Sequence, residues 1–370
     1  MSAEQIPKFK TLEITLSATG VAELAFNQPK LYNALTPEAY RDWLAAITWA
    51  ANNDAVKVTV LTGRGKYYTS GQKLELPNFS DDNLLETLNR RREVTKNVVA
   101  QMIQFPKLLI AAINGPSIGF GTTTMALCDV IYSVPHATFT TPFMKLGFCA
   151  EGGSSVLFPR IMGPSKANEM LLLISLAQLM GRTFTAEEMR DCGMISRLIS
   201  AENFRETVLG YAEEAAKFSL EAMKVTKELV RRVDREILLQ ANEEEIERLA
   251  ERMSSQDSLE SIMRFVDFAC LCHWSKVKLT CWDNCPDDSE KHTQSGLVTN
   301  YCSQPGANAS IPIWSATPTP TPVAASTAIG TGIAAPTTAA TTKPNNAGTA
   351  LTIGQGLLGT AGLAAAYMLL

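Results

Sequence analysis

The distribution of charge along the chain constrains its fold most strongly. Every Asp, Glu and Arg of the 370 residues lies before residue 291, and after Lys291 only Lys343 carries a formal charge. Before that point, charged and apolar residues are mixed as in a globular protein, whereas the remainder lacks the charges that cover a globular surface. We therefore predict a globular body followed by a tail of different character. The small net charge of −4 does not favour a nucleic-acid partner.

Composition divides the chain into three parts. Residues 1–268 form the predicted body, and residues 269–345 form a linker that begins with cysteines and continues as a Thr/Ala/Pro-rich tract. Such a tract cannot bury a core, so we expect it to be disordered. The cysteine spacings in the linker match no zinc motif, and we predict no metal site. Residues 346–370 form an apolar segment near the length of a membrane helix, although its glycines and alanines weaken a prediction of membrane contact.

Hydrophobic periodicity within the body predicts an α/β fold. Alternating apolar residues at 12–16 and the run at 21–26 predict a hairpin at the start. A Thr-Pro pair at 36–37 is typical of a helix N-terminus. The uninterrupted apolar run at 108–113 predicts a central strand, and strand, loop, helix and strand then recur. From residue 154 the pattern becomes mostly helical, so we expect an α/β body with a C-terminal helical extension.

Two glycine-containing loops and one acidic residue carry the chemistry that the sequence suggests. The loops span residues 70–74 and 114–121, and Glu151 follows within an Ala-Glu-Gly-Gly sequence. Taken singly, each glycine is best explained by a tight turn after a strand. Together, the loops offer two places where backbone N–H groups could approach a ligand, and Glu151 offers a carboxylate able to move a proton. Glycine and apolar neighbours would desolvate this carboxylate and raise its pKa.

These motifs resemble those of the crotonase, or enoyl-CoA hydratase/isomerase, superfamily. The resemblance rests on Asn-Ala-Leu at 33–35, Ser-Gly at 70–71, Ile-Ala-Ala-Ile-Asn-Gly at 110–115, Cys-Asp at 128–129 and Glu-Gly-Gly at 151–153. It extends over about residues 8–268 in order and spacing, which makes it more specific than a lone glycine pattern. It implies the crotonase fold, a spiral of ββα units, and an acyl-CoA substrate.

The resemblance also implies roles for individual residues. Carried over by position, the backbone N–H groups of Gln72 and Phe120 would bind the thioester oxygen of an acyl-CoA. Preorganised donors of this kind stabilise the negative charge that develops when a proton beside the thioester is removed, by about 3 to 4 kcal/mol each. Glu151 would be the catalytic residue. The residues expected to contact substrate are Ser70, Gly71, Gln72, Lys73, Leu74 and Phe120.

The reaction that the resemblance implies depends on which acids are missing. Hydratases of this family use two glutamates, and the positions that align with them hold Thr123 and Phe143, neither of which can act as a base. A single glutamate at position 151 resembles the Δ3,Δ2-enoyl-CoA isomerases, especially their peroxisomal branch. Glu151 would remove the C2 proton of a 3-enoyl-CoA, a dienolate would form at the amides of Gln72 and Phe120, and Glu151 would reprotonate C4. The product is trans-2-enoyl-CoA, and no cofactor is expected because CoA enters as part of the substrate.

Two alternatives stay open. One is an enoyl-CoA hydratase or another crotonase-type enolate chemistry, and the other is a membrane-tethered acyl-CoA-binding protein, which only the apolar segment 346–370 supports. The resemblance further implies a homo-oligomer, either a trimer or a hexamer, and a peroxisomal location in fatty-acid or specialised acyl-CoA metabolism. A targeting tripeptide of the Ser-Lys-Leu type is absent from the end of this chain, so a cytoplasmic or tail-anchored location is the alternative.

Overall fold

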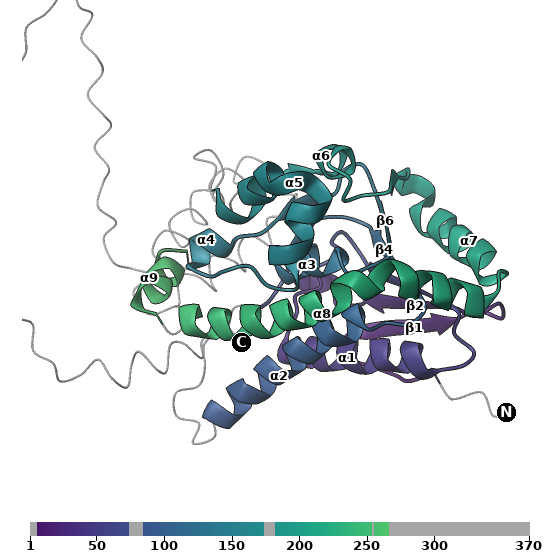
Figure 1. Ribbon diagram of the computed structural model, residues 1–370, viewed down its shortest axis with the longest axis horizontal. Coiled ribbons are helices and arrows are strands. Elements are labelled where there is room, and N and C mark those ends of the chain that lie inside the picture. Colours follow the sequence, from purple (N-terminus) through teal and green to yellow (C-terminus); the bar gives the residue numbers. More distant parts are fainter. Residues whose placement is uncertain (1–5, 74–83, 174–181, 254, 266–370) are drawn as a thin grey trace, which may run out of the picture. The chain divides into compact units, whose positions relative to one another are not determined.

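Two β-sheets form the framework of the described chain, and strands of the larger one are labelled in Figure 1. The computed structural model describes residues 6–73, 84–173, 182–253 and 255–265. Within these residues, the larger sheet has the strand order β1-β2-β3-β4-β6-β9 and the smaller sheet has the order β5-β7-β8. The strands are β1 Leu12–Leu16, β2 Val21–Phe26, β3 Val58–Gly63, β4 Leu108–Ile113, β5 Ser117–Ile118, β6 Val130–Ser133, β7 Thr138–Thr140, β8 Phe184–Thr185 and β9 Arg197–Leu198.

The larger sheet begins as a hairpin and continues as a parallel sheet. β1 and β2 are antiparallel, with Leu12 opposite Phe26, which confirms the predicted hairpin. Strands β2, β3, β4, β6 and β9 then pair in parallel. Every residue of β2 and β3 is buried, as expected for parallel strands covered on both faces. The predicted central strand at 108–113 is β4 and is also confirmed.

Helices pack around this sheet and begin where local sequence signals place them. The side chain of Thr36 accepts a hydrogen bond from the N–H of Ala39, and Pro37 occupies the first position of α1. α1 contacts β1, β2 and α2, while α7 contacts β2, β3 and β4. The helices are α1 Pro37–Asn52, α2 Leu84–Ile103, α3 Phe120–Met125, α4 Phe143–Leu146, α5 Ser154–Leu172, α6 Ala186–Asp191, α7 Phe204–Ala216, α8 Leu220–Met253 and α9 Gln256–Phe265, with 3-10 turns at Pro29–Leu31 and Ala201–Asn203.

The predicted helical extension is present and consists mainly of α8, which runs beside α2 and α5 (Figure 1). Asp129, directly before β6, anchors this helix to the sheet. Its carboxylate lies 2.7 Å from Lys227 Nζ and 3.1 Å from an Arg231 guanidinium nitrogen. Asp129 of the Cys-Asp pair at 128–129 therefore has a structural role, because it holds α8 against the sheet. Several apolar side chains of α8 are exposed, namely Val225, Leu229, Val230, Val233 and Ile237.

Some predictions concern residues outside the described ranges. Leu74 lies there, as do the linker 269–345 and the apolar segment 346–370. The division of the chain into body, linker and apolar segment therefore stays a prediction. Among the residues that the structure describes, no helix combines the length and apolar character needed to span a membrane.

Candidate active site

The two glycine-containing loops lie directly against each other. Thr69 and Ser117 form a parallel bridge, and the N–H of Ile118 donates a 3.1 Å hydrogen bond to the carbonyl oxygen of Thr69. A Cβ atom at Gly71 would lie 2.7 Å from the carbonyl oxygen of Ile118, and one at Gly121 would lie 2.1 Å from Thr69 Cγ2. Close packing between the loops therefore requires glycine at both positions, beyond any need for a turn.

Backbone pairing leaves the N–H groups of Gln72 and Phe120 available to a ligand. The N–H of Leu35 donates to the carbonyl of Gly71, and the N–H of Lys73 donates to the carbonyl of Leu35. Gln72 lies between these two bonds, so its own N–H is directed away from Leu35. Phe120 is the first residue of α3, where N–H groups have no partner within the helix. Neither N–H is bonded to another described residue, as an oxyanion donor requires.

Glu151 lies on the loop that leads into α5, and this loop packs on α3. Gly152 and Gly153 have φ values of 67° and 77°, in the left-handed region that favours glycine. A Cβ atom at Gly152 would lie 2.7 Å from Thr123 Oγ1, one helical turn after Phe120. Glu151 itself is 8% exposed. The predicted acid and one predicted donor are thus both associated with the same short helix.

Two carboxylates shape the electrostatics at this loop. Burial first, and then the charge of Glu245, raise the pKa of Glu151 from its usual 4.5 to about 8. Glu245, on α8, accepts hydrogen bonds from the backbone N–H groups of Gly153 at 2.7 Å and Ser155 at 3.0 Å. A carboxyl group with a pKa of about 8 can both accept and return a proton near neutral pH. Glu151 therefore has the property of a general acid–base group.

A cavity of about 260 Å³ opens beside Gln72. The ring of Tyr40 forms part of its wall and packs edge-on against the ring of Phe120, with centroids 5.2 Å apart. The cationic side chains that line the cavity are Arg41, Lys73, Arg90 and Arg91. This cationic rim suits an anionic ligand.

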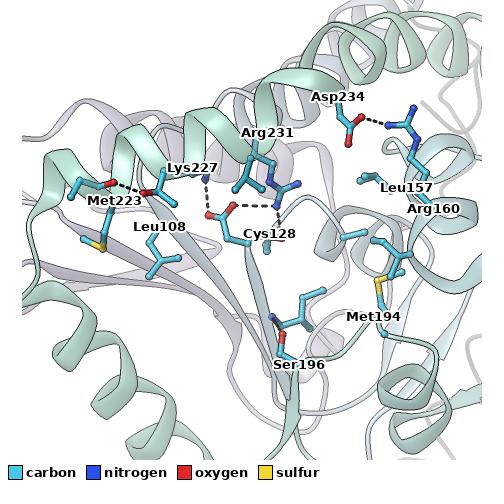
Figure 2. Close-up of a pocket in the computed structure, with 18 of the residues that line it drawn as sticks. Leu108, Cys128, Leu157, Arg160, Met194, Ser196, Met223, Lys227, Arg231 and Asp234 are labelled. Carbon is cyan, nitrogen blue, oxygen red and sulfur yellow. Dashed lines mark hydrogen bonds and ion pairs between the residues drawn. The ribbon is translucent and has the colours of Figure 1, made fainter.

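A larger cavity, of about 700 Å³, lies along α8 (Figure 2). Asp129, Lys227 and Arg231 line it together with apolar side chains such as Met194. Its lining includes none of the described residues predicted for the site, namely Ser70, Gly71, Gln72, Lys73, Phe120 and Glu151. A large cavity is often a ligand site, but the carboxyl group with a raised pKa and the available backbone donors do not line this one.

Comparison with known proteins identifies the family. The family model for enoyl-CoA hydratase/isomerase matches residues 17–270. The chain belongs to this family. It is 36% identical over 261 residues to human enoyl-CoA delta isomerase 2, which covers 70% of this chain and 64% of that protein. It is 32% identical over 265 residues to the peroxisomal enoyl-CoA delta isomerase 3 of Mus musculus, which covers 71% of this chain and 80% of that protein.

Solved structures of the enoyl-CoA hydratase/isomerase family share the fold. A crystal structure of a member from Pseudoalteromonas atlantica T6c has a TM-score of 0.60 and 28% identity, and the match covers 70% of this chain and 97% of that one. The predicted crotonase fold is therefore confirmed. Members of this family act on acyl-CoA thioesters and typically form oligomers. The chain spans less than two thirds of the human relative's length.

Two residues close to Glu151 escaped the sequence analysis. Glu245 ends a run of three glutamates at 243–245, a pattern that predicts a solvated helix face. Tyr40 stands four residues after a helix cap, and the pattern around it indicates only the apolar face of a helix. The structure leaves both side chains only 6% exposed. For Glu245, the helical spacing with the buried residues Leu238 and Leu249 is the signal that could have revealed it.

Proposed function

We propose that this protein is a Δ3,Δ2-enoyl-CoA isomerase that converts 3-enoyl-CoA to trans-2-enoyl-CoA. The observation that most supports the proposal is the state of Glu151, a buried carboxyl group with a raised pKa whose loop packs on α3. The N–H of Phe120, at the start of the same helix, is free among the described residues. The human and mouse relatives, both named as enoyl-CoA delta isomerases, add support from the family.

The mechanism requires one acid and two backbone donors. Ionised Glu151 removes a proton from C2, and the electron pair of that C–H bond forms a dienolate. The negative charge on the thioester oxygen is stabilised by the N–H groups of Gln72 and Phe120. Protonated Glu151 then delivers the proton to C4, the double bond moves from C3–C4 to C2–C3, and the carbonyl group re-forms. Because the proton count is unchanged, one carboxylate suffices and no cofactor enters the reaction.

The residues at the two hydratase positions favour isomerisation over hydration. The hydroxyl of Thr123 donates a 3.1 Å hydrogen bond to the carbonyl oxygen of Phe120, and Phe143 is a buried apolar side chain. Neither residue can remove a proton from water. An assay that offers 3-enoyl-CoA and trans-2-enoyl-CoA separately tests this point. We expect conversion of the first and no hydration of the second; hydration at a comparable rate would favour a hydratase.

Binding of the substrate is supported by the cationic rim. Ser70 and Gly71 form the loop before Gln72, and Arg41, Lys73 and Arg91 surround the cavity next to it. These charges complement the phosphate groups of CoA. A non-catalytic, membrane-tethered acyl-CoA-binding protein would bind the same ligand without turnover. Isomerase activity would therefore exclude that alternative, and binding without activity would support it.

We further propose a homo-oligomer and a peroxisomal location. The exposed apolar side chains of α8, from Val225 to Ile237, form a surface that a second copy of the chain can cover. Size-exclusion chromatography with light scattering tests this association. The peroxisomal location is supported by the name of the mouse relative, and a cytoplasmic or tail-anchored location is the alternative that cell fractionation would distinguish.

A further inference from the structure

Tyr40 carries a buried hydroxyl that has no hydrogen-bond partner among the described residues. The residue is 6% exposed and is held on α1, whose neighbouring Trp43 is fully buried. Most buried hydroxyls in native structures are paired, so an unpaired one calls for an explanation. One explanation is a partner that accepts the hydrogen bond in another state of the protein.

The position of Tyr40 ties this hydroxyl to the proposed active site. Its ring packs on Phe120 and lines the same cavity as Gln72, so it contacts or adjoins both residues proposed as oxyanion donors. After burial, the charge of Glu151 is the second cause that raises the pKa of Tyr40. The geometry agrees, because Tyr40 packs on Phe120 at the start of α3, and the loop of Glu151 packs on the same helix through Gly152.

The carboxyl group of Glu151 accepts no hydrogen bond from any described residue. Burial and the charge of Glu245 both oppose its ionisation. Cys149, two residues before Glu151, is a further titratable group, and its pKa is raised by burial and then by the charge of Glu151. The charged side chains that line the cavity with Tyr40 are the four cations of the rim, Arg41, Lys73, Arg90 and Arg91.

We propose that Tyr40 is a positioning residue whose hydroxyl donates a hydrogen bond to the Glu151 carboxylate when that group is ionised, an inference that rests on the proposed role of Glu151 as the base. The two groups are not bonded in the structure, so the bond forms when the Glu151 side chain turns toward the hydroxyl. A neutral donor stabilises the carboxylate without adding a positive charge that would suppress its basicity. It also fixes the direction in which the carboxylate faces the substrate.

Substitution of Tyr40 by Phe tests this role, with substitution of Tyr68 by Phe as the matched control. Tyr68 is buried as well, and its hydroxyl also has no partner among the described residues. Its pKa is raised by burial and by Cys128, without a contribution from Glu151. Both substitutions therefore remove one unpaired buried hydroxyl and keep the ring, but only Tyr40→Phe removes the proposed donor.

Kinetics give the first measurement. We expect Tyr40→Phe to lower kcat about tenfold to a hundredfold, which corresponds to the loss of one hydrogen bond to a charged group. The acid limb of the kcat/KM profile should move to higher pH by about one unit, because Glu151 ionises less readily without the donor. Tyr68→Phe should keep the wild-type kcat and pH profile. Coincident kcat values and pH profiles for the two variants would overturn the proposal.

Carbon-13 NMR of the Glu151 carboxyl group gives a second measurement that needs no substrate. The signal is assigned by its loss in Glu151→Gln and titrated in the wild-type protein and both tyrosine variants. A higher Glu151 pKa in Tyr40→Phe alone supports the proposal, even if the isomerase assay itself fails. Equal pKa values in all three proteins overturn it. A lower kcat with an equal pKa also overturns it, because the hydroxyl would then act on the substrate.

Discussion

Glu245 Oε2 accepts a 2.7 Å hydrogen bond from the backbone N–H of Gly153, two residues after Glu151. This contact joins α8 to the loop that carries the proposed base. It fixes the loop at the start of α5, and it also places a second carboxylate near Glu151, whose pKa it helps to raise. The helical extension therefore contributes to the electrostatics around Glu151 as well as to the fold.

Substitution of Glu245 by Gln should lower the pKa of Glu151. The change removes a like charge, while the amide oxygen can still accept the hydrogen bond from Gly153. We expect the acid limb of the kcat/KM profile to move to lower pH by on the order of one unit. Glu244→Gln, at an exposed position of the same helix, should leave the profile unchanged. A profile that is the same in the Glu245 variant and the wild type would contradict the proposed electrostatic role.

Substitution of Glu151 by Gln should make the protein relatively more stable as the pH rises. The folded-state pKa of about 8 lies above the usual 4.5, so the folded state binds more protons between these values. The contribution of Glu151 to the free energy of unfolding is therefore present below about pH 4.5 and lost as the pH rises to about 8. Thermal unfolding at pH 5, 7 and 9 should show a Tm difference that grows in favour of Glu151→Gln. A difference independent of pH would mean that Glu151 titrates normally.

Substitution of Gly152 by Ala should disrupt the loop. Its φ of +67° is strained for alanine, and the new Cβ would lie 2.7 Å from Thr123 Oγ1. We expect a loss of about 2 kcal/mol in the free energy of unfolding and a marked fall in kcat. Gly210→Ala is the matched control, because a Cβ there meets nothing within 4 Å in the middle of α7 and should stabilise the protein by about 0.5 to 1 kcal/mol. Chemical denaturation distinguishes the two, and equal effects would refute the packing argument.

Substitution of Asp129 by Ala should weaken the attachment of α8 to the sheet. The change leaves the largely buried cations of Lys227 and Arg231 without their carboxylate partner (Figure 2). Removing one partner of such a cluster costs about 3 kcal/mol. Glu251→Gln, which breaks an exposed pair with Arg248 on the same helix, should cost less than about 0.5 kcal/mol. Denaturant unfolding of both variants provides the comparison, and similar losses would show that Asp129 does not anchor the helix.

Much of the fold followed from local sequence patterns. The hairpin, the Thr-Pro start of α1 and the apolar strand β4 each depend on a few neighbouring residues, so the local sequence is enough to predict them. The smaller sheet was not predicted. Its strands β5, β7 and β8 are two or three residues long, and such short pairings are set by tertiary contacts more than by periodicity.

The candidate site divides in the same way. Glu151 and the two loops could be predicted because close backbone packing at Gly71 and Gly152 requires glycine, and glycine is visible in the sequence. Tyr40 and Glu245 were missed because their positions matter only once α1 packs against Phe120 and α8 packs against the loop of Glu151. The assignments of Gln72 and Phe120 as donors stay predictions that a structure with a bound acyl-CoA would test.

The fate of the C2 hydrogen tests the central claim most directly. A 3-enoyl-CoA carrying deuterium at C2 is incubated in ordinary water with the wild-type protein and with Glu151→Gln, and turnover and the label at C4 of the product are measured. We predict that the wild type forms trans-2-enoyl-CoA with a measurable share of deuterium at C4. Glu151→Gln should bind acyl-CoA but lose activity by at least about a hundredfold. Wild-type turnover by Glu151→Gln would contradict the proposal that this carboxylate moves the proton.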